Sequence, residues 1–126
     1  MLEFKSYRMV SMPYAQCNVT IGIDDGVLRS VELTSYNTLV ISIFKSVDDK
    51  KWRILCTGTY SPTTIKHINK FIKEFFGENL YHYCKEISGL GGKLLPKQDY
   101  DRVIKRAFDY KNDNCERKVK RFYGEY

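Results

Sequence analysis

The chain has 126 residues, of which 43% are hydrophobic, and it carries a formal net charge of +6. This length fits one compact domain, and the hydrophobic share is too high for a disordered chain. No apolar run approaches the ~18 residues of a membrane helix, and the first residues lack the apolar stretch of a secretory signal. We therefore expect a single domain over residues 1–126 that stays in the cytoplasm, with its four cysteines reduced and no membrane partner.

Residues 1–60 show the alternation of apolar and polar side chains that is typical of antiparallel strands. The Asp-Asp-Gly at residues 24–26 predicts a hairpin, since an Asp-Gly pair favours the tight turn between two strands. Val27, Val31 and Leu33 continue the apolar pattern beyond that turn. Strands are expected at residues 4–10, 19–23, 27–33, 38–44 and 52–59.

The pattern changes at Ser61. Ser61 as N-cap and Pro62 as first helical residue predict a helix start, and Gly77 predicts its end. Within this helix the apolar residues recur on one face and the lysines on the opposite face. The apolar set is Ile65, Ile68, Phe71, Ile72 and Phe75, and the basic set is Lys66, Lys70 and Lys73.

Two further helices are expected, at residues 79–87 and from Pro96 or Asp99 to a break at residues 112–114. A glycine-rich loop at 89–92 separates them, and residues 115–122 add a basic helical turn or two. The inward positions of the last long helix are Tyr100, Val103, Ile104, Ala107 and Phe108. The fold class is therefore α+β, with an N-terminal antiparallel β-meander of three to five strands packed against C-terminal helices.

The positive charge is concentrated in the helical part. Residues 61–126 hold fourteen basic against nine acidic side chains, whereas residues 1–60 hold seven against six. Such a field favours anionic partners, although a solvated basic surface that aids solubility accounts for it equally well. The candidate partner-binding residues are Lys66, Lys70 and Lys73, His67 at the edge between the apolar and basic faces, and Arg117, Lys118, Lys120 and Arg121.

The residues that could carry catalysis or metal are poorly arranged for either. Structural zinc sites usually place ligands in close pairs, and only His82 and Cys84 are close here. The loop at residues 89–93 lacks the hydroxyl residue after Lys93 that a phosphate-binding loop needs. The acidic pairs at 24–25 and 48–49 fall in turns, where Asp is favoured locally. We expect no enzyme, no catalytic residues, no cofactor and no metal.

A cysteine nucleophile activated by His67 or His82 is the remaining enzymatic alternative. It requires an accessible thiol in an electropositive setting with a base within hydrogen-bond reach. Cys56 lies mid-strand on the expected core side, together with Trp52 and Ile54. This placement favours a buried apolar role.

One segment resembles known proteins. The pattern SYxT beginning at Ser35, followed by YSxTTxKHI beginning at Tyr60, is similar to a group of small, mostly uncharacterised proteins encoded by bacteriophages and other mobile elements. The resemblance covers roughly residues 35 to 75. It implies a phage accessory role in the host cytoplasm and supplies no catalytic residues.

Two functions follow as expectations. The first is a non-enzymatic inhibitor of a host defence ribonucleoprotein, similar to an anti-CRISPR, which blocks a nuclease or its nucleic-acid channel. The alternative is a nucleic-acid-binding accessory or regulatory protein, in which the basic residues contact phosphates of DNA or RNA. The sequence does not name the host protein, the complex or the nucleic acid.

Overall fold

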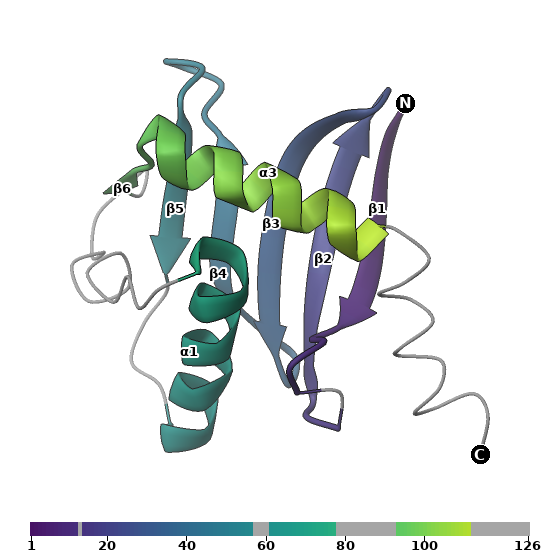
Figure 1. The fold of residues 1–126 in the computed structure, drawn as a ribbon, viewed down its shortest axis with the longest axis vertical. Helices are drawn as coiled ribbons and strands as arrows, with labels where there is room; N and C mark the ends of the chain where they lie inside the picture. The colour runs from purple at the N-terminus through teal and green to yellow at the C-terminus, as the bar shows by residue number, and fades with distance from the viewer. Residues whose placement is uncertain (13, 57–60, 78–92, 112–126) are drawn as a thin grey trace.

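The computed structural model describes residues 1–12, 14–56, 61–77 and 93–111. The described chain forms a six-stranded antiparallel sheet in the order β1-β2-β3-β4-β5-β6, and two helices cover one face of it (Figure 1). The α+β class and the N-terminal meander are thus confirmed. The elements are β1 (Leu2–Arg8), β2 (Cys17–Asp24), β3 (Val27–Ser35), β4 (Thr38–Lys45), β5 (Trp52–Cys56), α1 (Pro62–Phe76), β6 (Lys93–Leu94) and α3 (Lys97–Lys111).

Alternation of side chains along the strands positions the core on the face that the helices cover. In β5, Trp52, Ile54 and Cys56 are buried and the residues between them are not, as the sequence predicts. The same period of two places Val19 and Ile21 of β2 in the core. The two-residue strand β6, which pairs with β5 at the sheet edge, is an element that the sequence did not predict.

The first hairpin differs from the simple alternation. Val27 is 53% exposed, and Leu28 takes the core position instead. The cause is a register shift between Gly22 and Ile23, because one extra residue in β3 opposes the same stretch of β2. A bulge of this kind turns the following side chains to the other face.

Helix α1 begins and ends where the sequence predicts. The Ser61 hydroxyl accepts a hydrogen bond from the Thr64 amide at 3.2 Å, and Gly77 closes the helix at a φ of 81°. A left-handed cap of this kind suits glycine, which has no Cβ. One inward assignment was wrong, however, because Ile65 is 42% exposed.

Helix α3 begins at Lys97, directly after Pro96, and crosses the strands obliquely (Figure 1). Val103 and Ala107 are fully buried, as expected, while Tyr100, Ile104 and Phe108 pack at the core's margin. The sequence did not predict that Tyr110 is also fully buried, against Phe75 of α1 and Tyr7 of β1.

Neither described helix is long and apolar enough to cross a membrane. The expected helix at 79–87, the loop at 89–92, the break at 112–114 and the basic turn at 115–122 all lie outside the described residues.

Candidate functional site

Residues of the SYxT…YSxTTxKHI pattern meet at the N-terminal end of α1. Ser35 closes β3, and its hydroxyl lies 2.8 Å from Nδ1 of His67 and 3.2 Å from the hydroxyl of Thr64. Thr64 and His67 are three positions apart and therefore share one helix face. Tyr36, in the turn after β3 with a φ of 55°, places its ring 5.8 Å from the His67 ring.

The expected boundary position of His67 is corrected by this arrangement. His67 is only 2% exposed, so its side chain offers no surface to a partner. The buried face of α1 extends through Thr64 and His67 because β3 supplies a polar side chain, Ser35, for them to contact. A polar side chain can be buried when a neighbouring strand supplies its hydrogen-bond partner.

A serine beside a histidine also invites comparison with a nucleophile and its base. Such a pair must be reached by a substrate, and both Ser35 and His67 are 2% exposed. Burial lowers the pKa of His67 below its usual value, so the imidazole is neutral at pH 7. A neutral, enclosed cluster of this kind joins the helix to the sheet.

The three lysines of α1 lie where the sequence predicts. Lys66, Lys70 and Lys73 are all exposed, on the side of the helix away from the core. None of them forms an ion pair with any other residue that the structure describes. They form what we call the lysine face. The other expected cations, Arg117, Lys118, Lys120 and Arg121, lie outside the described residues.

A second polar cluster holds the opposite end of α1. The Glu74 carboxylate, 10% exposed, accepts hydrogen bonds from Arg106 at 2.8 Å, from the Ser11 amide at 3.2 Å and from the Tyr110 hydroxyl. Tyr110 also accepts a hydrogen bond from the Val10 amide at 3.0 Å. Burial raises the pKa of Tyr110, so it stays a neutral donor.

A groove of about 350 Å³ lies beside this cluster, between the end of α1 and α3. Its basic side chains are Arg102, Lys105 and Arg106. Arg102 donates to the Phe76 carbonyl at 2.8 Å and Arg106 is paired with Glu74, so both already stabilise the helix packing. The Glu74 carboxylate offsets the charge of Arg106, whereas Arg102 and Lys105 keep their positive charge at the groove.

The described cysteines do not form a reactive centre. Burial raises the pKa of Cys17 to about 11, which keeps the thiol protonated. Cys56 is buried on the core side of β5, while Cys84 and Cys115 lie outside the described residues. Within the described ranges, no three His, Cys, Asp or Glu side chains gather in a way that could hold a metal.

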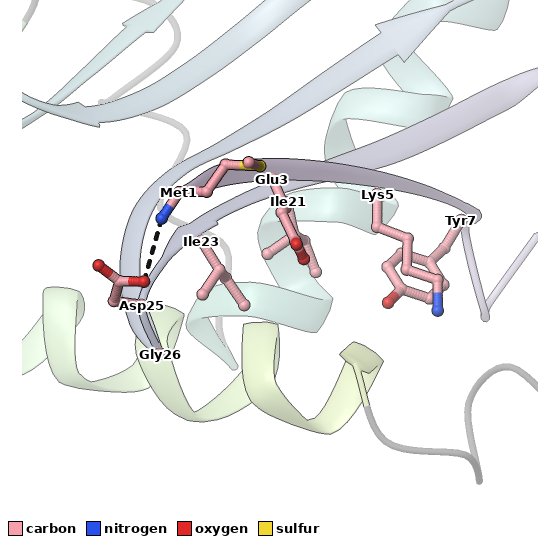
Figure 2. Close-up of a pocket in the computed structure, with 8 residues that line it drawn as sticks. All are labelled: Met1, Glu3, Lys5, Tyr7, Ile21, Ile23, Asp25 and Gly26. Carbon is pink, nitrogen blue, oxygen red and sulfur yellow. Dashed lines mark hydrogen bonds and ion pairs between the residues drawn. The ribbon is translucent and has the colours of Figure 1, made fainter.

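A hollow of about 210 Å³ lies beside the edge strand β1 (Figure 2). Met1, Glu3, Lys5 and Tyr7 line it along one side of the strand, and Ile21 and Ile23 line it from β2. The Lys5 ammonium lies 5.8 Å from the centre of the Tyr7 ring. The sequence analysis did not predict this row of β1 side chains. The alternation of Glu3 and Lys5 with Leu2 and Phe4 was the signal that could have indicated it.

The comparisons with known proteins give one family. The model for a family described as "Family of unknown function (DUF8033)" matches residues 14–89, which is more than half of the chain. The matched range includes β2 to α1, and with them Ser35, Thr64, His67 and the lysine face. No curated protein and no solved structure matches the chain.

Proposed function

This chain belongs to the DUF8033 family, and we propose that it is a non-catalytic protein that binds the phosphate backbone of nucleic acid through the lysine face of α1. The observation that carries the proposal is the row of Lys66, Lys70 and Lys73 on the exposed side of a helix whose other side is packed in the core. A capped, anchored helix holds the Cα atoms of the three lysines in a fixed row. From this row the flexible lysine side chains can reach neighbouring phosphates of one strand.

The anchoring of α1 supports this reading. The helix is held at both ends by polar contacts, which are buried at Ser35 and His67 and part-buried at Glu74. Lys66 and Lys73 are seven positions apart in the helix, a rise of roughly 10 Å. Three lysines over that length match a few phosphates of one strand. Arg117, Lys118, Lys120 and Arg121 add four further positive charges to the chain.

The second candidate is the inhibitor of a host defence ribonucleoprotein. It is favoured by the resemblance of the Ser35 and Tyr60 segments to phage proteins. The same lysine face would then contact guide RNA, target DNA or an acidic protein surface inside the complex. The two candidates differ in whether free nucleic acid is bound.

A charge-reversal experiment tests the main proposal. In the variant K66E/K70E/K73E, affinity for duplex DNA, single-stranded DNA or RNA should fall by orders of magnitude. The slope of log affinity against log salt should flatten by about 3 on duplex DNA, at roughly 0.9 for each lost phosphate contact. Fluorescence anisotropy over a salt series measures both quantities.

The matched control is K45E/K50E/K51E, which makes the same change of net charge with three exposed lysines of β4 and the following turn. Both triple variants should fold normally, since exposed substitutions usually change stability by less than about 0.5 kcal/mol each. Equal losses in the two variants would show a general charge effect and contradict the assignment to α1. Absence of any binding to free nucleic acid, with capture of a CRISPR effector in a pull-down, favours the inhibitor.

A further inference from the structure

Strand β1 is the end strand of the sheet formed by the described residues. It pairs with β2 on one side, and on its other side no strand of the described chain pairs with it (Figure 1). Leu2 and Phe4 point to the uncovered face of the sheet, where Phe4 is 59% exposed, while Glu3 and Lys5 point to the side of the helices. An open strand of seven residues is a template for pairing with another chain.

We propose that two copies of this chain pair through β1, antiparallel, about a two-fold axis at Phe4. The two sheets then join into one continuous sheet across the dimer. A two-fold interface uses the same surface patch on both copies, so the strand must be complementary to itself. The order of side chains along β1 meets that requirement.

The charges select the register. With Phe4 opposite Phe4 of the second copy, Glu3 lies opposite Lys5 of the second copy, and Lys5 opposite its Glu3. Opposite charges and aromatic pairs that face each other across antiparallel strands are stabilising, and like charges are destabilising. Sliding one copy by two residues brings either two Lys5 or two Glu3 side chains face to face.

A slide by one residue is excluded for a different reason. It would set the helix side of one sheet against the uncovered side of the other, because successive side chains alternate between faces. A two-fold axis perpendicular to the sheet places the helix-covered faces of both copies on the same side of the joined sheet. Of the nearby registers, only the one centred on Phe4 therefore keeps both faces aligned and pairs opposite charges.

The residues around β1 are compatible with a second copy of the chain at this edge. The Phe4 ring packs over Gly22 of β2, where a Cβ atom would lie 2.8 Å from the ring, so the uncovered face of β1 carries a flat apolar contact between these two residues. The hollow of about 210 Å³ that Glu3 and Lys5 line opens beside the same strand (Figure 2). The two cross-strand ion pairs would lie along it. Pairing also closes the edge, so the assembly stops at two copies through β1.

The competing explanation is that Glu3 and Lys5 are the charged side chains that proteins place on edge strands to prevent pairing. Sedimentation equilibrium on the full chain, without nucleic acid, separates the two. We expect the wild type to dimerise. E3K and K5E alone should each weaken the dimer by roughly ten-fold or more, because each brings like charges face to face.

Mixing makes the test specific. An equimolar mixture of E3K and K5E restores complementary pairs and should form a heterodimer, and the double variant E3K/K5E should dimerise like the wild type. The matched control D48K/K50E alters two charges in the exposed turn after β4 and should leave the dimer unchanged. A monomeric wild type up to its solubility limit, or single variants that dimerise normally, would overturn the proposal.

A cysteine scan checks the register. Directly opposed residues bring their Cβ atoms to about 4.5–5.5 Å, and a small backbone shift brings this to the roughly 4 Å of a disulfide. Phe4→Cys should therefore cross-link two copies under mild oxidation, whereas Leu2→Cys, which lies opposite Ser6 of the second copy, should not. Equal cross-linking at the two positions would contradict the axis at Phe4. The outcome is independent of nucleic-acid binding.

Discussion

The two ends of α1 are anchored by different chemistry. At the N-terminal end, neutral groups of Ser35, Thr64 and His67 contact one another in a buried position. At the C-terminal end, the Glu74 carboxylate accepts hydrogen bonds from Arg106, from the Tyr110 hydroxyl, and from the amide and hydroxyl of Ser11. The two anchors of this one helix can therefore be compared in three respects. These are the stability lost when an anchor is broken, the response of that stability to pH, and how far the sequence predicts the anchor.

The difference lies in what each anchor leaves behind when it is broken. Removing one member of a neutral cluster leaves dipoles without partners, which costs about 1–3 kcal/mol. Removing one member of an enclosed ion pair leaves a charge without compensation, which costs about 3–5 kcal/mol. Breaking each end separately measures this contrast within one protein.

The largest effect is expected at Glu74. Glu74→Ala should lower the free energy of unfolding by about 3 kcal/mol, because Arg106 keeps its charge in a site that is only 26% exposed. Urea denaturation at pH 7 measures the loss. Asp101→Ala, which removes an exposed carboxylate from α3, should cost less than about 0.5 kcal/mol. Similar losses in the two variants would show that Glu74 does not anchor the helix.

A smaller loss is expected at the neutral end. Ser35→Ala removes the hydroxyl that contacts both His67 and Thr64, and should lower the free energy of unfolding by about 1–2 kcal/mol. The control is Ser42→Ala, on the uncovered face of β4, where a change within about 0.5 kcal/mol is expected. If Ser35→Ala proves as costly as Glu74→Ala, the distinction between the anchors does not hold.

The neutral end should also respond to acid. Burial lowers the pKa of His67 in the folded state, so below pH 6.5 the unfolded chain binds more protons than the folded one. Stability is then full above pH 6.5 and falls as the pH drops from there toward the folded-state pKa, by at most about 1.4 kcal/mol per pH unit.

Urea denaturation between pH 7.5 and pH 5 tests this sign. His67→Gln should lose most of the slope, although it is less stable at pH 7. His82→Gln, which alters the other histidine of the chain, serves as the control and should keep the wild-type slope. A slope that survives in His67→Gln would assign the titration to another group.

The smallest effect is expected at the N-cap. Ser61→Ala removes the acceptor of the Thr64 amide and should cost about 1 kcal/mol, the usual value for such a cap. Thr63→Ala, one residue from Thr64 but exposed, should leave the thermal midpoint unchanged or slightly raised. If both variants behave alike, the cap does not contribute to the neutral anchor.

The neutral anchor was partly visible in the sequence. Ser35, Thr64 and His67 fall within the pattern that resembles phage proteins, and the helix start and end followed from Ser61 and Gly77. What the pattern did not show was that His67 is buried. A helical wheel places it at the margin of the apolar face, and only Ser35, on a strand more than thirty residues earlier in the chain, turns that margin inward.

The charged anchor was not visible at all. Ser11, Glu74, Arg106 and Tyr110 come from three segments far apart in the chain, and none belongs to a motif. Local spacing determined the strands, the caps and the lysine face, because period and capping depend on near neighbours. The bulge that buries Leu28, the inward turn of His67 and the enclosure of Glu74 were decided by tertiary structure, since each depends on which distant backbone or side chain lies opposite.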